Sequence, residues 1–270
     1  MKNFNGQVAA ITGAGSGMGQ ALAVQLANEG CHVAISDIDP EQLATTEAMI
    51  GNRVNVSTHV VDVADKVAVK NFANAVVQHH GKVNMIFNNA GVSVTDLVSR
   101  MPLEDFEWLM NINFWGVVHG TRAFLPLISE QSEGHIVNTS SIFGTIALPT
   151  QSAYNASKFA VRGYTYALRQ ELKDSHVGVS CVQPGGVKTN IVKSSRFVPM
   201  DNASATKDEA VAKFESLAGL TSEQAADIIL NGVRKNKAQI LVGKDAKFIA
   251  ILERLFPVGY QKILGNFLDD

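Results

Sequence analysis

Short apolar runs alternate along the chain with longer segments in which apolar residues recur at helical spacing. The short runs are rich in β-branched residues and are predicted strands over residues 7–12, 32–36, 54–61, 85–88, 135–139, 177–182 and 239–243. The longer segments, such as 19–30 and 66–80, have the pattern of amphipathic helices. Regular alternation of strand and helix predicts βαβ units, and continuously apolar strands indicate a sheet buried on both faces. We therefore expect one α/β domain over residues 1–270, a doubly wound parallel sheet of about seven strands with helices on both faces.

Two regions interrupt this alternation. Residues 188–220 are polar, small and irregular, and a connection of that length within a compact domain usually has a function. From Lys247 onward, apolar residues at Phe248, Ile251, Leu252, Leu255 and Phe256 form a helical stripe, which Pro257 should end or kink. Residues 245–270 are therefore expected to form a C-terminal helical tail.

Composition narrows the class of protein. Apolar residues make up 46% and charged residues 18% of the 270, which excludes a disordered chain. A formal net charge of -2 gives no electrostatic signature for nucleic acid, so we expect no such partner. Because no apolar h-region precedes residue 13 and no run approaches the ~18 apolar residues of a membrane span, we expect a cytoplasmic protein. Cys31 and Cys181 lie in apolar strand regions and are predicted to be buried free thiols.

The sequence TGAGSGMG, which begins at Thr12, follows a predicted strand and precedes a predicted helix. Glycines that lack a Cβ allow a pyrophosphate to approach the backbone, and the helix N-terminus offers free N–H groups. A glycine-rich turn without a ligand is the alternative, but the strand–loop–helix context favours a Rossmann-like nucleotide site. We expect the phosphates to lie against Gly13, Ser16, Gly17, Met18 and Gly19.

Asp37 ends the second predicted strand, 24 positions after Gly13. A carboxylate at this place can accept hydrogen bonds from the adenosine ribose and would repel a 2′-phosphate, so it favours NAD over NADP. Asp37 could instead cap the helix that begins near Pro40, but Asp39 fits that role better. NADP remains the less favoured cofactor, because no lysine or arginine follows Asp37 closely.

Tyr154 and Lys158 lie four residues apart on a predicted helix over 152–172, and therefore on one face. A free phenol has a pKa of ~10, and a nearby ammonium favours the phenolate, as a positively charged nicotinamide would. The pair is common by chance, and a core tyrosine beside a surface lysine is the alternative.

Six motifs together resemble the short-chain dehydrogenase/reductase family in order and spacing. They are TGAGSGMG, NNAG at 88–91, NINFWG at 111–116, the serines at 140–141, YNASK at 154–158 and PGGVKT at 184–189. The resemblance covers residues 5–190 strongly. It implies an oxidoreductase that transfers a hydride between a nicotinamide cofactor and an alcohol or carbonyl substrate, with Tyr154 as general acid/base.

The resemblance also implies roles for the neighbours of Tyr154. Lys158 would lower the pKa of the phenol and hold the nicotinamide ribose. Ser141, which lies 13 positions before the tyrosine, would orient the reacting oxygen in preference to Ser140. Asn113 would hold a water molecule in a proton relay, although a locally satisfied helix amide is the alternative.

Further cofactor contacts follow from the same resemblance. Asn89, Ala90 and Gly91 would lie near the adenosine ribose. Asp62 and Val63 would contact adenine, whereas Asp65 fits a helix cap. Pro184, Gly185, Val187 and Thr189 would lie at the carboxamide of nicotinamide.

The predicted surroundings of the substrate are apolar. Residues 190–220 would form a lid over it, with Ile191, Val192, Phe197, Val198, Met200 and Phe214, and the opening would be lined by Val92, Val94, Leu97, Ile142, Phe143 and Leu148. Simple core packing is the alternative for any one of them. The set favours a small lipophilic alcohol, ketone or aldehyde.

The tail admits three partners: the lid, another subunit or a membrane surface. Lys244, Lys247, Arg254 and Lys262 make it mildly basic, but Pro257 and Gly265 limit a continuous interfacial helix, so packing against protein is favoured over membrane contact. The resemblance implies a homodimer or homotetramer formed through the Tyr154 helix. No metal is expected, because the histidines form no ligand cluster with the cysteines, and His79–His80 are predicted to cap a helix end in solvent.

Two other functions remain open. A dinucleotide-binding redox sensor without turnover would keep the fold, but family members of that kind usually lose the tyrosine or the lysine. A dehalogenase or epimerase would also keep the fold, but dehalogenase-like relatives lack the phosphate loop, which is intact here.

Overall fold

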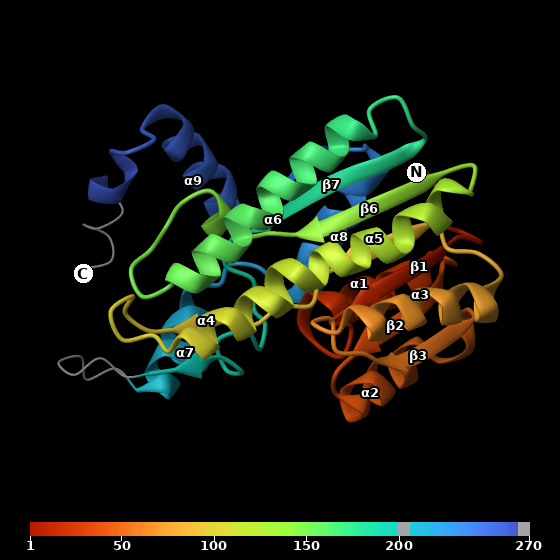
Figure 1. Cartoon of the computed structure of the whole chain (residues 1–270), viewed down its shortest axis with the longest axis horizontal. Helices are drawn as coiled ribbons and strands as arrows, with labels where there is room; N and C mark the ends of the chain where they lie inside the picture. Colours follow the sequence, from red (N-terminus) through yellow and green to blue (C-terminus); the bar gives the residue numbers. More distant parts are fainter. Residues whose placement is uncertain (199–205, 264–270) are drawn as a thin grey trace.

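The computed structural model describes residues 1–198 and 206–263 and contains a seven-stranded sheet in the order β3-β2-β1-β4-β6-β7-β9 (Figure 1). Its strands are β1 (Val8–Thr12), β2 (His32–Asp37), β3 (Val56–Val60), β4 (Met85–Asn88), β6 (Gly134–Thr139), β7 (Val177–Pro184) and β9 (Gln239–Val242). Every neighbouring pair is parallel, as predicted. The chain order reverses at β1, which lies between β2 and β4, and ligands of doubly wound sheets bind at such a switch point.

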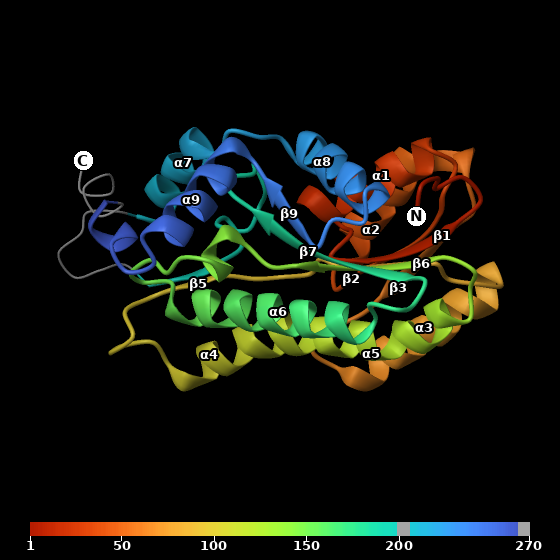
Figure 2. The ribbon, with the colours of Figure 1, turned by 90° about the horizontal axis from the view of Figure 1, so that it is seen from above.

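Helices cover both faces of the sheet, which confirms the doubly wound arrangement (Figure 2). One layer holds α1 (Gly17–Asn28), α2 (Pro40–Ile50) and α8 (Ser222–Arg234); the other holds α3 (Lys66–His80), α5 (Gly116–Ser129) and α6 (Ser152–Glu171). Asp39 and Asp65 accept hydrogen bonds from the first turns of α2 and α3, so both predicted caps are confirmed.

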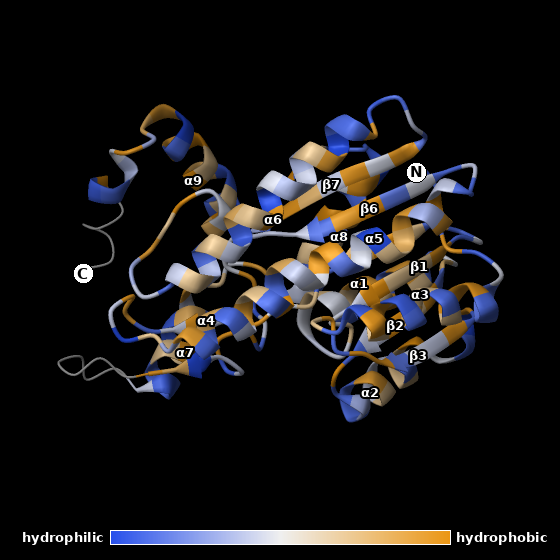
Figure 3. Cartoon of the chain, viewed as in Figure 1, coloured by the Kyte–Doolittle hydropathy of each residue, from blue (hydrophilic) through white to orange (hydrophobic). Residues whose placement is uncertain are grey.

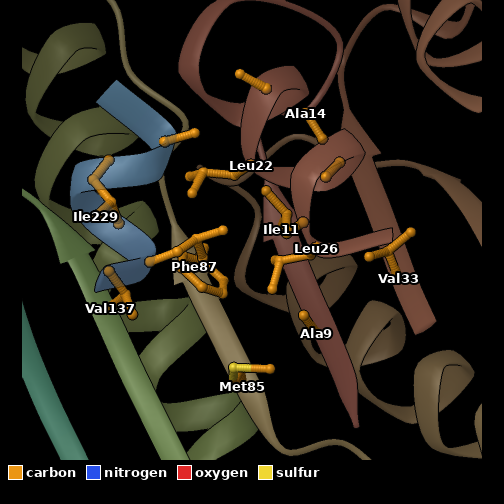
Figure 4. Close-up of a cluster of buried hydrophobic side chains, with 14 of the residues drawn as sticks. Ala9, Ile11, Ala14, Leu22, Leu26, Val33, Met85, Phe87, Val137 and Ile229 are labelled. Atoms are coloured by element: carbon orange, nitrogen blue, oxygen red, sulfur yellow. The ribbon is translucent and has the colours of Figure 1, made fainter. Parts of the chain in front are cut away.

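Two large apolar clusters, one on each side of the sheet, form most of the core. Ala9 and Ile11 of β1 belong to one cluster, and Val8 and Ala10 belong to the other. In the first, Leu22 and Leu26 of α1 and Ile229 of α8 pack over Ile11 and Phe87 (Figure 4). Because successive strand residues point to opposite faces, a sheet covered on both sides needs apolar residues at successive strand positions, and Figure 3 shows orange stretches along the strands.

Cys31 and Cys181 are buried free thiols, as predicted. Burial raises the pKa of each to about 12, so neither is a reactive thiolate at neutral pH.

Smaller elements lie at the carboxyl edge of the sheet. They are the two-stranded parallel sheet of β5 (Val94–Thr95) and β8 (Arg196–Phe197), α4 (Leu103–Met110), a π-helix η2 (Asn111–Trp115), the short helix η3 (Ile142–Gly144), α7 (Lys207–Leu217) and α9 (Lys244–Leu255). The predicted lid therefore contains β8 and α7, while Met200 lies outside the described residues. In the tail, α9 ends before Pro257 as expected, and residues 264–270 are not among those described.

The histidines at the end of α3 differ from their prediction. Gly81, with a φ of 77°, ends the helix, and the rings do not cap it. The His80 ring instead hydrogen-bonds the Ser57 hydroxyl at 2.9 Å, because this end of α3 packs beside β3. Within 1–198 and 206–263, no helix combines the length and apolar character needed to cross a membrane.

Candidate active site

The glycine loop between β1 and α1 folds against the NNAG turn that follows β4. Gly13 and Gly17 have φ values of 65° and 55°, which side chains rarely adopt. A Cβ on Gly13 would lie 2.7 Å from the Ala90 Cα, and one on Gly19 would lie 2.0 Å from the Gly13 carbonyl oxygen. The loop therefore needs glycine both for its conformation and for the close approach of its backbone to a neighbouring turn.

Thr12 and Asn89 join the two turns by hydrogen bonds. The Thr12 hydroxyl accepts from the backbone N–H groups of Asn89 (3.0 Å) and Ala90 (3.1 Å). The Asn89 amide donates to the carbonyls of Thr12 (3.2 Å) and Gly13 (3.3 Å). Its buried Oδ1 has no hydrogen-bond partner in the described part of the chain, which leaves an acceptor for a ligand. Sequence reasoning missed the role of Thr12, whose signal is a hydroxyl directly before the first loop glycine.

Asp37 lies beside the glycine loop, and Asp39 caps α2. One carboxylate oxygen of Asp37 accepts from the Gly15 N–H at 2.9 Å, and the other accepts from the Ile38 N–H at 2.8 Å. The structure thus separates the two aspartates as the sequence predicted. Ser16 forms the N-cap of α1 without a capping bond from its side chain, and Met18 packs against the core.

Asp62 and Val63 follow β3 along the same edge of the sheet. The exposed Asp62 accepts from the Ala64 N–H at 2.9 Å. Val63 is buried, and a Cβ on Gly116 would lie 2.8 Å from its Cγ2. The pair therefore lies between β3 and the start of α5.

Tyr154 and Lys158 face the same space from the first turns of α6. The Lys158 Nζ lies 5.5 Å from the centroid of the Tyr154 ring and donates to the Thr139 carbonyl, at the end of β6, at 3.0 Å. Lys158 is 2% exposed, so it is not the surface lysine of the alternative interpretation. A buried amine held beside a phenol is an arrangement that can influence proton transfer.

The two serines after β6 have different partners. The Ser140 hydroxyl donates to the backbone carbonyl of Lys158 at 2.7 Å and so ties α6 to the sheet. The Ser141 Oγ accepts from the Phe143 N–H at 3.1 Å and lies close enough to the Tyr154 phenol to oppose the rise in its pKa. The structure therefore brings Ser141, and not Ser140, to the phenol.

Burial is the largest cause of the pKa shifts of Tyr154 and Lys158. It raises the pKa of Tyr154 to about 12, against a smaller opposite effect of the Ser141 hydrogen bond. It lowers the pKa of Lys158 to about 8. The net shift of the phenol pKa is upward, because loss of solvation is its largest cause, and the lowering expected from Lys158 stays a prediction.

Asn113 lies in the π-helix η2, which the sequence did not predict. Its side chain exchanges two hydrogen bonds with the backbone of Val92, at 2.8 and 2.9 Å, and donates to the Ser157 hydroxyl at 3.2 Å. A Cβ on Gly91 would lie 3.3 Å from the Asn113 Oδ1 and 3.5 Å from the Lys158 Nζ. Asn113 thus links η2, the NNAG turn and α6, and it is not satisfied within its own helix.

The PGGVKT segment continues from β7 toward the glycine loop. A Cβ on Gly17 would lie 3.3 Å from the Thr189 Cγ2, so Thr189 is beside the phosphate loop. Pro184 pairs with Val242, and Val187 is buried and bridges Leu220. The Asp245 carboxylate accepts from the Gly186 N–H at 2.6 Å and would clash with a Cβ on Gly185. Sequence reasoning missed Asp245, since it is about sixty positions from the glycine pair it holds.

Apolar side chains surround Tyr154 on two sides. Val94, Leu109 and Ala153 form a buried cluster against which Val92 and Tyr154 pack. On the other side, the Phe143 ring meets the Tyr154 ring edge to face at 6.1 Å between centroids. Phe143 and Leu148 in turn pack against Ile146. Of the other predicted lining residues, Ile142 is buried, Ile191, Val192, Phe197 and Phe214 are half-buried, and Leu97 and Val198 are each 38% exposed.

A separate hollow of about 420 Å³ lies between the end of α2 and the start of β3. It is lined by residues such as Glu47, Asn52 and Asn55 and contains none of the predicted site residues. We therefore locate the candidate site at the carboxyl edge of the sheet, where the predicted side chains meet, and not at this hollow.

Comparison with known proteins shows the family to which the chain belongs. A family model described as short chain dehydrogenase matches residues 7–197. The chain is a short-chain dehydrogenase. This dehydrogenase is 43% identical over 270 residues to the protein SadH of Mycobacterium tuberculosis, covering 98% of the chain and 96% of SadH.

Solved structures agree with this assignment. A short chain dehydrogenase/reductase from Burkholderia phymatum, crystallised in complex with NAD, is 31% identical with a TM-score of 0.84, and 95% of each chain is covered. Levodione reductase is 27% identical with a TM-score of 0.80, covering 92% of this chain and 99% of that one. The dehydrogenase is therefore a Rossmann-like oxidoreductase whose family uses a nicotinamide cofactor.

Proposed function

We propose that this short-chain dehydrogenase transfers a hydride between NAD and a lipophilic secondary alcohol or its ketone, or a fatty alcohol or aldehyde. The convergence of Ser141, Tyr154 and Lys158 beside the glycine loop is the observation that carries the proposal. A phenol, a hydroxyl and a buried amine that lie together support this reaction, because alcohol oxidation and carbonyl reduction both need a proton donor or acceptor and a group that orients the reacting oxygen.

The residues at the switch point fit a dinucleotide. The loop glycines let the loop pack closely against the NNAG turn at the start of α1, and Asn89 keeps a free buried acceptor. The Asp37 carboxylate would accept hydrogen bonds from the hydroxyls of the adenosine ribose, which supports NAD over NADP. Ser16, Gly17 and Met18 would hold the phosphates at the start of α1. When bound, the nicotinamide ring accepts or donates the hydride.

The adenine and nicotinamide ends would be held by the flanking segments. Asp62 and Val63 are proposed at the adenine, and Ala90 and Gly91 at its ribose. Pro184, Gly185, Val187 and Thr189 are proposed at the carboxamide, and Lys158 at the nicotinamide ribose. Thr189 beside Gly17 supports this, because one ligand can then contact both.

Proton transfer is assigned to Tyr154. In oxidation its phenolate takes the substrate hydroxyl proton, and in reduction the phenol returns it to the carbonyl oxygen. Ser141 hydrogen-bonds the reacting oxygen and orients it. The pKa of the phenol is about 12 with Lys158 already beside it, so we expect the positive charge of the bound oxidised cofactor to favour the phenolate further. Asn113 is proposed to hold a water molecule behind Lys158.

The substrate class rests on the apolar surroundings of Tyr154. Val92, Val94 and Phe143 lie around the phenol. Residues 190–220 would act as the lid of this single domain. We also propose a cytoplasmic homodimer or homotetramer that associates through α6, on which Phe159 is 42% exposed.

The experiment mixes the purified protein with NAD or NADP and a series of secondary alcohols of increasing chain length. Formation of reduced cofactor is followed by its absorbance. We expect turnover with NAD, and a kcat/KM that rises about fourfold for each added methylene buried. Absence of turnover with every alcohol of the series and, with NADH, with every corresponding ketone, or a preference for short polar alcohols, would contradict the proposal.

A further inference from the structure

α9 exposes an apolar stripe to solvent. Phe248, Ile251 and Leu255, at i, i+3 and i+7, lie on one helix face and are 60%, 59% and 66% exposed. Phe256 and Val258, which follow the helix, are 51% and 75% exposed. Figure 3 shows this segment as alternating orange and blue. Five large exposed apolar side chains within eleven residues are a concentration of the kind that marks an interaction site.

The opposite side of the segment is fixed to the protein. Leu252 and Tyr260 are buried against Ile146, and the Tyr260 hydroxyl accepts from the Ala147 N–H at 3.0 Å. At the start of α9, Asp245 holds the Gly186 N–H. The apolar stripe is therefore presented outward by a segment that is anchored to the loop directly after Ser141, at the carboxyl edge of the sheet (Figure 2).

Basic side chains border the stripe. Lys247 and Arg254 are exposed and, at about 100° per residue, both lie on the same side of it. Lys244 and Lys262 are also exposed. Of the acidic residues in the described part of the segment (244–263), Asp245 is engaged with Gly186, and Glu253 lies about 160° away from the stripe on the helix. On the described part of the segment, the exposed cations therefore lie closer to the stripe than the acidic residues do.

We propose that this face, which we call the α9 face (Lys244, Lys247, Phe248, Ile251, Arg254, Leu255, Phe256 and Val258), binds the surface of an anionic lipid bilayer. An apolar stripe flanked by cations suits the boundary between acyl chains and negatively charged headgroups. A second copy of the chain fits less well, because pairing the same face across a two-fold axis brings the cations of both copies together.

The α9 face would place the substrate side near the lipid. Phe143, whose ring meets the Tyr154 ring, and Leu148 pack against the same cluster as Leu252. A lipophilic substrate could then reach the site from the bilayer without crossing water. This consequence rests on the proposed function, whereas the lipid binding itself does not.

Co-sedimentation of the full chain with vesicles tests the binding. We expect it to sediment with phosphatidylglycerol vesicles and at least tenfold less with phosphatidylcholine vesicles. The double variant Ile251→Ser/Leu255→Ser, and separately Lys247→Glu/Arg254→Glu, should each weaken binding to phosphatidylglycerol at least tenfold, since one cation contributes about fivefold. The matched control is Val67→Ser/Lys70→Glu, an exposed apolar and basic pair on α3, which should bind like the parent.

Equal binding of all variants, or no sedimentation above that with phosphatidylcholine, would overturn the proposal. So would self-association in analytical ultracentrifugation that Ile251→Ser/Leu255→Ser abolishes, because the face would then join two copies. Thermal unfolding confirms that the variants fold. The variants should oxidise a water-soluble alcohol in the absence of vesicles at the rate of the parent. This measurement tests the proposed function separately, so a failure of lipid binding does not imply a failure of the proposed function, or the reverse.

Discussion

Ser140 and Ser141 are adjacent in sequence but are bound to different parts of the site. Ser140 holds the backbone of α6 through the Lys158 carbonyl, and Ser141 faces the Tyr154 phenol. The backbone of an extended segment turns successive side chains to opposite sides, so two neighbouring hydroxyls acquire separate roles. This gives a physical reason for the choice of Ser141, which the sequence supported only through the spacing of a family.

Alanine substitutions should separate the two roles. Ser141→Ala should lower kcat about 100-fold, since one orienting donor is lost, with little change in the free energy of unfolding. Ser140→Ala should lower the free energy of unfolding by about 1 kcal/mol, because it removes a buried hydrogen bond. Steady-state kinetics and urea unfolding measure both. Equal kinetic losses in the two variants would contradict the assignment.

Asp37 is expected to determine the cofactor. Asp37→Asn keeps an oxygen that can accept from the Gly15 N–H but removes the charge. We expect NADH affinity to fall about tenfold and NADPH affinity to rise, because the ribose loses a charged acceptor and the 2′-phosphate loses a repulsion. Fluorescence titration with each reduced cofactor tests this. Tighter binding of NADPH by the parent chain would refute the role of Asp37.

Among the elements, the long periodic ones were predictable and the short ones were not. The seven apolar runs became the seven sheet strands, and the stripe of 66–80 became α3. β5 and β8 contain two residues each, which is too short for any periodic pattern, and their pairing depends on tertiary contacts. The π-helix η2 has the same local composition as an α-helix, so its insertion is visible only in the structure.

His135 of β6 illustrates how a buried element responds to pH. Its ring hydrogen-bonds the Ser180 hydroxyl at 2.8 Å and packs over Gly178 of β7, where a Cβ would lie 2.5 Å away. Burial lowers its pKa to about 3. Between the unfolded value of 6.5 and about 3, the unfolded chain therefore binds more protons than the folded one, and stability is lost as pH falls.

This group alone should remove about 2 kcal/mol of unfolding free energy between pH 7 and pH 5. His135→Gln should reduce the loss over that interval by about this amount, whatever its effect at pH 7. Urea unfolding of both proteins at the two pH values measures the difference. An identical pH dependence in the two proteins would show that His135 already titrates normally when folded. Burial also lowers the pKa of His80 to about 4, so His135→Gln should keep part of the pH dependence of stability.

At the scale of the whole molecule, the site is assembled from segments that are far apart in sequence. The loop after β1, the turn after β4, η2, the end of β6, the start of α6 and the segment after β7 meet at the carboxyl edge of one sheet (Figure 1). The order of motifs indicated these segments, because parallel strands place their carboxyl ends together. Thr12 was missed although a hydroxyl directly before the first loop glycine signals it, whereas Asp245 was not predictable, since it acts on a backbone N–H that only the fold brings near.

The influence of burial on the chemistry also required the whole molecule. From the sequence, the four-residue spacing suggested that Lys158 lowers the pKa of the phenol. In the structure both groups lose most of their solvation, so Tyr154 shifts upward and Lys158 downward. Which effect dominates depends on the packing around α6, and no local pattern reports it.

The central claim is that Tyr154 exchanges the proton that accompanies hydride transfer. The most direct test compares Tyr154→Phe with the parent chain, using NAD and the best alcohol of the series, and measures kcat together with NADH affinity. We predict that kcat falls 100- to 10,000-fold, roughly the contribution of a general acid/base, while NADH binds within about twofold of the parent. A kcat that stays within tenfold of the parent, with cofactor binding intact, would contradict the account.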